Sequence, residues 1–224
     1  MKRRATSTRR PSPDREQRRQ EILRAAIRLF AQRGMENVTF GDIAKAARLS
    51  RPLVYFYFPD LETLFLEAVI VGSGKVHQRF QHAIRPSLAG LDQIMALGAA
   101  YVQFARDEPE LFQLLAHKET KQSSPDKPEH PLETECRRVF GGIMDILVAA
   151  LKKGREDGSI RRDIGDPAKV AVCLWGLTHG LIQIAATQQP TIECKLGAAA
   201  ATDLPDFGLD LLCRSLAAPK RRAN

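Results

Sequence analysis

The sequence contains few of the residue groupings that catalysis or metal binding requires. Its four cysteines are far apart and include no C-x-x-C pair, which argues against a zinc site and against a disulfide scaffold. We also find no glycine-rich phosphate loop, no cluster of metal ligands and no grouped nucleophile and base. A small helical enzyme is therefore the disfavoured alternative, and we predict a protein that is not an enzyme and needs no cofactor or metal.

The sequence also lacks a hydrophobic run of membrane-spanning length. The most apolar stretch, AVCLWGLTHGLIQIAA, is interrupted by His179 and Gln183 and falls short of the roughly 20 apolar residues of a transmembrane helix. The stretch MKRRATSTRRPSPD is basic but has no apolar centre, so it does not resemble a signal peptide. We therefore predict a cytoplasmic protein without a membrane partner.

Acidic residues are scarce in the first quarter of the chain, where the excess positive charge gathers. Residues 1–58 contain 14 Lys and Arg against 5 Asp and Glu, whereas residues 59–224 contain 20 against 21. The net charge of +8 therefore belongs to the N-terminal segment. A basic segment joined to a nearly neutral body is typical of a polyanion-binding module with a second domain. The alternative is an arm that only increases solubility.

No segment shows the alternation of a β-strand and no internal repeat is present, so we predict an all-α fold. We expect four parts: a disordered basic arm at 1–13, a three-helix domain at 14–60, a larger helical domain at 61–217 and a basic tail at 218–224. The expected helices of the larger domain lie at 61–73, 75–86, 91–107, 109–118, 132–156, 166–187 and 203–217. A polar, proline-rich loop is expected at 119–131.

Three short helices are expected between Asp14 and Pro59. Ile22, Ala26 and Phe30 form an apolar stripe at helical spacing, and Gly34 follows at the position of a C-cap glycine. Thr39 and Asp42 have the spacing of a capping box at the start of the second helix. After the tight turn Arg48-Leu49-Ser50, Ser50 is placed to cap a third helix that has Pro52 in its first turn. This arrangement predicts a helix-turn-helix.

Four consecutive aromatic residues, Tyr55 to Phe58, occupy the third helix and cannot all face inward. Successive helical residues point about 100° apart, so Val54 and Phe58 should pack on the core. The other face carries the candidate DNA-contacting residues, which are Arg51, Pro52, Leu53, Tyr55, Phe56 and Tyr57.

Each side chain on that face has chemistry suited to DNA. Arg51 can donate two hydrogen bonds to a guanine edge, while Pro52 and Leu53 can contact thymine methyl groups. The hydroxyls of Tyr55 and Tyr57 can reach phosphate oxygens. Phe56 is either a half-buried support or an apolar base contact. The alternative is that this face packs against the rest of the protein, as tyrosine pairs often do.

The stretch TFGDIAKAARLSRPLVYFYFPDLETLF resembles the signature of the TetR family of bacterial transcriptional regulators. The preceding helix, Ile22 to Gly34, is also similar to the first helix of that family, and LWGLTHGLIQIA resembles a long C-terminal helix of many members. The signature positions that match are Thr39, Ile43, Ala44, Ala47, Ser50, Tyr55, Tyr57, Phe58 and Leu64.

The resemblance implies a homodimer with two DNA-binding heads on an all-helical body. It implies binding to a palindromic operator on double-stranded DNA, release when an unknown small-molecule effector enters the body, and repression as the common outcome. By the same resemblance Thr39 contacts phosphate through the start of its helix. Arg51, Pro52 and Leu53 would lie on base edges, and Tyr55 and Tyr57 on the DNA backbone.

Three residues depart from the family pattern. Arg48 replaces the usual turn glycine, so either arginine adopts the left-handed conformation or the turn differs. Gly41 and Leu61 replace residues that commonly contact DNA, and we expect the basic arm to compensate. An interaction protein that has lost operator binding is the alternative that these two departures favour.

The helices at 132–156 and 166–187 have apolar stripes too broad for one packing partner. Core packing explains much of each stripe, but the resemblance favours a two-fold interface of four helices. The candidate interface residues are Val139, Ile143, Ile146, Leu147, Val170, Leu174, Leu177 and Leu181.

Aromatic and apolar residues of the larger domain are candidates for an effector pocket, because ligand sites are mostly apolar with few polar groups. The candidates are Phe104, Phe112, Leu115, Trp175 and His179. The alternative for each of them is ordinary core packing. His179 is expected to be a hydrogen-bonded core or interface histidine rather than a metal ligand.

Overall fold

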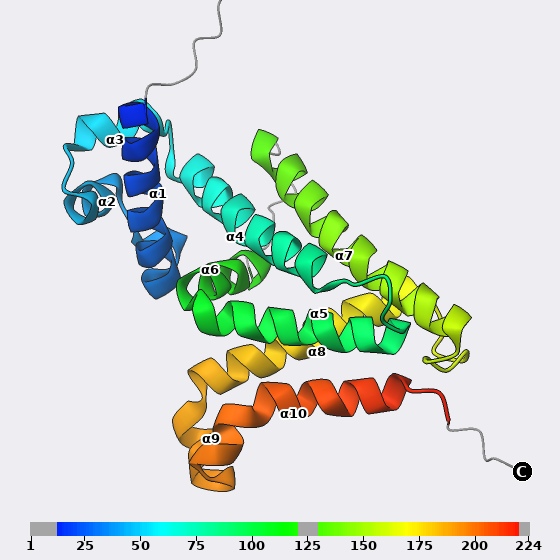
Figure 1. The fold of residues 1–224 in the computed structure, drawn as a ribbon. Helices are drawn as coiled ribbons and strands as arrows, with labels where there is room; N and C mark the ends of the chain where they lie inside the picture. The colour runs from blue at the N-terminus through cyan, green and yellow to red at the C-terminus, as the bar shows by residue number, and fades with distance from the viewer. Residues whose placement is uncertain (1–12, 121–129, 220–224) are drawn as a thin grey trace, which may run out of the picture. The chain divides into compact units, whose positions relative to one another are not determined.

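The computed structural model describes residues 13–120 and 130–219, and these residues form an all-α protein (Figure 1). The prediction of fold class is therefore confirmed. Within the described ranges the only β-type pairing is an isolated antiparallel bridge between Ile160 and Ala217. The chain divides into two compact units after Ala68, which lies inside a helix rather than at the expected boundary near residue 60.

The first unit is built from three helices, a 3-10 turn and the start of a fourth helix. The bounds are α1 Pro13–Arg33, η1 Met35–Asn37, α2 Phe40–Ala47, α3 Arg51–Tyr57 and α4 Leu61–Ala83. Their apolar sides meet in one core, because the amphipathic helices must bury their stripes together. The fully buried residues of this core include Ile22, Ala26, Phe30, Ile43, Val54, Phe58 and Leu64.

The second unit consists of the rest of α4 and six more helices. Their bounds are α5 Gly90–Asp107, α6 Pro109–Thr120, α7 Pro131–Asp157, α8 Pro167–Thr187, α9 Gln189–Leu196 and α10 Ala198–Leu216. α5 lies at the centre and contacts α6, α7, α8 and α10, while α8 runs beside α10 (Figure 1). The largest fully buried side chains of α5 and α6 are Leu97, Phe104, Phe112 and Leu114.

Two helix predictions for the second unit are wrong in their boundaries. α4 continues through Gly72 and Gly74, where a break was expected, because a helix tolerates glycine at a cost of about 1 kcal/mol when packing favours the helix. A Cβ added at Gly72 would lie 3.4 Å from Leu115, so this glycine packs closely against the Leu115 side chain. α9 was not predicted, and α10 begins at Ala198 rather than 203.

Some predicted segments lie largely outside the described residues. They are the basic arm at 1–13, whose last residue begins α1, most of the loop at 119–131, and most of the tail at 218–224.

Candidate nucleic-acid interface and effector cavity

The start of α2 is fixed by reciprocal hydrogen bonds between Thr39 and Asp42. The Thr39 N–H donates to Asp42 Oδ2 at 2.9 Å, and the Asp42 N–H donates to Thr39 Oγ1 at 3.2 Å. The pKa of Asp42 is held below its ordinary value mainly by the hydrogen bond from the Thr39 side chain, and next by the one from the Thr39 backbone. The expected capping box is confirmed. Thr39 itself is exposed, so the residue expected to contact phosphate lies at the surface.

The turn between α2 and α3 depends on a strained residue. Arg48 has φ 57° and ψ 40°, and among the described residues it is the one non-glycine with positive φ. Its N–H donates to Lys45 O at 3.2 Å, and the Leu49 N–H donates to Ala44 O at 2.9 Å. Arginine therefore adopts the left-handed conformation here, and the tight turn that aims α3 is kept. Ser50 occupies the N-cap position of α3 without a capping hydrogen bond from its side chain.

α3 separates its residues into a buried face and an outer face, as the sequence predicts. Val54, within the helix, and Phe58, at its C-cap, are fully buried, whereas Tyr55 is 45% exposed and Phe56 is 65% exposed. The other outer residues are Arg51 and Pro52, which are exposed, and Leu53 and Tyr57, which are half-buried.

Arg51 and Tyr55 are held together one turn apart on the outer face. The Arg51 guanidinium donates to Tyr55 Oη at 3.3 Å and lies 5.6 Å from the centre of the Tyr55 ring. The same ring packs on Phe40 of α2, with 4.3 Å between ring centres. The side chain of Arg51 is thereby directed along α3.

α1 adds two arginines that the sequence analysis did not place in the site. Arg15 lies 5.3 Å from the ring centre of the exposed Phe56, a cation–π distance. Arg19 lies 4.9 Å from the ring of Phe58 and pairs with Glu67. Sequence spacing did not reveal these contacts, because residues 15 and 56 come together only when α1 packs beside α3.

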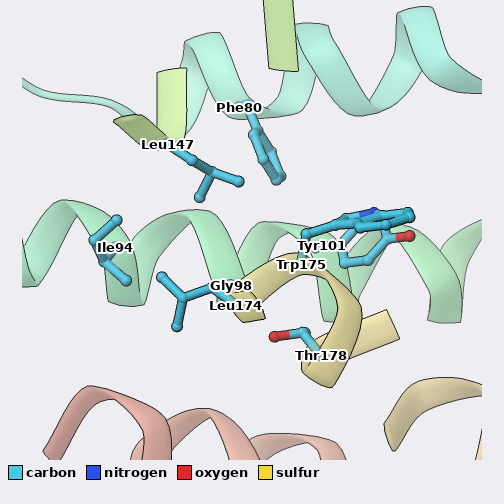
Figure 2. A pocket seen from close by; sticks show the side chains of 8 residues that line it. All are labelled: Phe80, Ile94, Gly98, Tyr101, Leu147, Leu174, Trp175 and Thr178. Carbon is cyan, nitrogen blue, oxygen red and sulfur yellow. The ribbon is translucent and has the colours of Figure 1, made fainter. Parts of the chain in front are cut away.

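The second unit contains a small, mostly apolar cavity of about 30 Å³ between α4, α5, α7 and α8. Figure 2 shows Ile94 at one end and Tyr101 and Trp175 toward the other. The lining residues are Phe80, Ile94, Gly98, Tyr101, Leu147, Leu174, Trp175 and Thr178. Among the predicted pocket residues, only Trp175 lines the cavity.

The remaining predicted pocket residues lie in the core around it. Tyr101 stacks on Phe104 at 6.3 Å between ring centres and lies 6.0 Å from the ring of Phe112. His179 lies 4.8 Å from Phe112 and 5.8 Å from Trp175. Leu115 is buried.

His179 joins two other polar groups in this aromatic surrounding. Its Nδ1 lies 2.7 Å from Tyr101 Oη, and its Nε2 lies 3.2 Å from Glu119 Oε2 at the end of α6. Burial lowers the pKa of His179, raises the pKa of Tyr101 and raises the pKa of Glu119 to about 7. Tyr101 therefore keeps its proton and donates it to Nδ1, which leaves the neutral ring's N–H on Nε2, facing Glu119.

No group of three His, Cys, Asp or Glu among the described residues could hold a metal ion. His179 is 94% buried on the inner side of α8, which fits the hydrogen-bonded core histidine that the sequence predicts.

The predicted interface residues divide between the interior and the surface. Ile143, Leu147 and Leu174 are buried inside one chain, which differs from the expectation that they face a partner; Val139, Ile146, Val170 and Leu181 are half-buried. Leu177 is 52% exposed. It belongs to a set of exposed apolar side chains on α8 and α10, which are Val172, Leu177, Ile184, Phe207 and Leu211; we name this set the apolar face.

α8 carries much of the apolar face. Pro167–Thr187 is the one described helix long and apolar enough to cross a membrane by length and composition, and only 28% of its most apolar window is buried. Such a helix needs a partner for its exposed side.

Family models match both units of the chain. Residues 22–68 match the model described as bacterial regulatory proteins of the tetR family. Residues 94–202 match the model described as the tetracyclin repressor-like C-terminal domain. Both matches agree with the resemblance seen in the residues of α2 and α3.

Curated proteins and solved structures give the same result. The probable acrEF/envCD operon repressor of Escherichia coli is 27% identical over 177 residues, which cover 74% of each chain. The HTH-type transcriptional regulator AcrR of Shigella flexneri is 47% identical over 49 residues, 22% of this chain and 23% of that protein. A bacterial regulatory protein in the tetR family from Rhodococcus RHA1 superposes with a TM-score of 0.73 at 18% identity, covering 91% of this chain and 98% of that one.

Proposed function

Since the chain belongs to the TetR family of transcriptional regulators, we propose that it is a cytoplasmic repressor that binds a palindromic operator as a homodimer. A small molecule that enters the second unit releases it from DNA. The family consists of regulators, so the chain is not an enzyme.

The observation that carries DNA binding is the outer face of α3. Arg51 is exposed on this face and can make a bidentate contact to guanine, and Pro52 and Leu53 follow as contacts to thymine methyl groups. In this proposal Thr39, Tyr55 and Tyr57 contact phosphates and fix the register of α3 in the major groove. Phe56 supports Arg15, which adds a further positive charge beside the same helix.

The test of operator binding begins with selection of a bound sequence from random duplexes, followed by a gel shift. Arg51→Ala should weaken specific binding by about 1–3 kcal/mol, roughly 5- to 150-fold, and relax the preference at one base pair. Arg162→Ala removes the same charge from an exposed position in the second unit and serves as the matched control. If the wild type dimerises but selects no sequence, the interaction-protein alternative replaces this proposal.

The apolar face supports the homodimer, and it moves the expected interface from α7 and α8 to α8 and α10. A second copy can cover the same face by two-fold symmetry, because an isologous contact pairs a surface with itself. Gly176 and Gly180 favour close approach, since a Cβ added at either would meet nothing of this chain within 4 Å.

Leu177→Arg tests the dimer by placing a charge on the apolar face, at a leucine that is 52% exposed. An unpaired buried charge costs about 3–5 kcal/mol, so the dimer dissociation constant should rise more than 100-fold in sedimentation velocity. Ala149→Arg makes the same change on the exposed side of α7 and should leave the dimer intact. Dimers of Leu177→Arg at wild-type strength would exclude this interface.

The cavity between α4, α5, α7 and α8 supports an effector site in the second unit. Its volume of about 30 Å³ is far below the roughly 300–1,000 Å³ of ligand sites, so binding requires the wall to open. Trp175 is the suitable wall residue, because it is half-buried and packs at 5.2 Å on Phe140, which is itself 38% exposed.

A further inference from the structure

The second unit contains a larger hollow at the end of α7, and its lining is charged rather than apolar. Its volume is about 440 Å³, which falls within the roughly 300–1,000 Å³ of small-molecule sites. Among the described residues the lining consists of Lys152, Arg155, Glu156 and Arg162, a set that we name the cationic hollow. Three cations against one carboxylate give it a formal charge of +2.

α7 supplies three of the four lining residues. Lys152, Arg155 and Glu156 stand at positions i, i+3 and i+4 of the helix and therefore share one of its faces. A cation in the last turn of a helix is also favoured by the negative end of the helix dipole, which is a sufficient reason for Arg155. The dipole does not account for Arg162, which lies five residues beyond the end of α7.

The backbone that leads to Arg162 is held in place. Ile160 is 1% exposed, and its N–H donates to Gly154 O of α7 at 2.9 Å. The Arg161 N–H donates to Leu216 O at the end of α10, also at 2.9 Å. The fold therefore brings Arg162 back beside the last turns of α7 on a fixed segment of chain.

The neighbouring cations have partners, whereas those of the cationic hollow have none among the described residues. Arg161 donates two hydrogen bonds to the carboxylate of Asp163, at 2.6 and 2.7 Å. Lys153 Nζ donates to Pro86 O at 2.6 Å. No side chain of the cationic hollow makes an ion pair or a hydrogen bond with another described residue. Like charges that the fold holds together repel one another, and an anion between them offsets that repulsion.

We propose that the cationic hollow binds a small dianion, and that the chemical class of this ligand is a phosphate monoester. Arginine suits such a group, because its guanidinium donates two parallel hydrogen bonds to phosphate oxygens. A phosphate monoester carries a charge of about −1.5 to −2 at pH 7, which complements the formal charge of the site. Glu156 repels an anion and lowers its affinity. The inference goes beyond the proposed function, since it requires neither operator binding nor the effector cavity.

Methyl phosphate and methyl sulfate test the charge of the ligand, because they have the same shape and differ by one negative charge at pH 8. In calorimetric titrations of the full chain without DNA, at constant ionic strength, methyl phosphate should bind about tenfold more tightly at pH 8. The second pKa of a phosphate monoester is about 6, so this preference should fall to about twofold at pH 5. Methyl sulfate keeps its charge and reports any change in the protein itself.

Three results on the wild type would overturn the proposal. Equal affinity for the two anions at pH 8, or no saturable binding of methyl phosphate, would exclude a dianion site. Tighter binding of succinate than of methyl phosphate would assign the site to dicarboxylates. Binding to phosphatidic acid vesicles without binding of methyl phosphate would make the hollow a membrane contact instead of a small-molecule site.

Variants of single charges locate the binding site. Arg155→Ala and Arg162→Ala should each weaken methyl phosphate binding about fivefold, and Glu156→Gln should tighten it about threefold. Arg138→Ala is the matched control, since it removes a positive charge from an exposed position of the same helix, 17 residues before Arg155. Equal losses in Arg138→Ala and Arg162→Ala would show a general effect of charge and refute the assignment. Circular dichroism checks the fold, and if a variant does not fold, the anion series on the wild type decides.

This test can be separated from that of operator binding. In the proposed function α3 of the first unit binds the operator, so Arg162→Ala can lose methyl phosphate binding and keep its operator affinity. A chain that binds methyl phosphate but selects no DNA sequence would keep this inference and lose the proposed function. The opposite result would remove this inference alone.

Discussion

α5 begins against α7 at a contact between two glycine backbones. A Cβ built on Gly90 would lie 2.1 Å from the Gly154 nitrogen, 2.3 Å from its Cα and 2.7 Å from Ala150 O. The same end of α5 is held by two hydrogen bonds, from the Gly90 N–H to Asp157 Oδ2 at 2.8 Å and from the Leu91 N–H to Ser159 Oγ at 3.1 Å. Gly90→Ala must therefore push two backbones apart and stretch both bonds.

The size of the effect follows from which atoms are displaced. Inserting a methyl group into a packed core costs about 1–3 kcal/mol, and occasionally more. Because the obstructing atoms at Gly90 are backbone, we expect the upper end, about 3 kcal/mol. For a chain of this size each kcal/mol lowers Tm by about 2–4 °C, so Tm should fall by roughly 6–12 °C. By contrast, Gly74 lies inside α4 with nothing within 4 Å of an added Cβ. Gly74→Ala should stabilise the helix by about 0.5–1 kcal/mol.

Thermal unfolding followed by circular dichroism and by Trp175 fluorescence measures both variants. Trp175 reports the second unit, so the change should be seen with both probes. Gly74→Ala is the matched control, since it adds the same methyl group to another helical glycine. A Gly90→Ala protein as stable as the wild type would show that α5 and α7 do not approach this closely.

Three further predictions concern single residues. Arg48→Gly should stabilise the protein by about 0.5–1 kcal/mol. The left-handed backbone costs a non-glycine residue about 1–2 kcal/mol, and the greater entropy that glycine loses on folding offsets part of this gain. Urea unfolding measures the change, and the control Arg48→Ala should show no such gain. Gly41→Lys fits, since an added Cβ meets only Thr39 Oγ1 at 3.5 Å, and should steepen the slope of log operator affinity against log salt by about 0.9. Burial raises the pKa of Glu119 from 4.5 to about 7, so the wild type loses stability as the pH rises from 4.5 to 7. Glu119→Gln should therefore raise Tm more at pH 8 than at pH 5. An equal increase in Tm at the two pH values would contradict this.

The sequence was sufficient for the DNA-binding half of the protein because the signals there are local. A capping box needs only Thr39 and Asp42 at the right spacing, and a seven-residue helix places Val54 and Phe58 on the opposite side from Tyr55 and Phe56. The signature around these residues also identified the family. The departure at Arg48, which replaces the usual turn glycine of the family, could also be located from its place in the turn.

Other features depended on contacts between segments far apart in the chain. Periodicity allowed core packing for Leu147 and Leu174, and the family resemblance made them candidate interface residues; both line the inner cavity. A helical stripe shows that a side is apolar and does not show whether the chain itself or a second copy covers it.

By itself, the sequence determined the all-α fold, the helix-turn-helix and the outward face of α3, since these follow from spacing within one or two helical turns. Only the tertiary structure decided that Glu119 faces His179, that Arg15 lies on Phe56 and that α10 joins α8 in the apolar face. Glu119 and His179 are 60 positions apart, and Arg15 and Phe56 are 41 positions apart. Helical periodicity carries no information about which helices become neighbours.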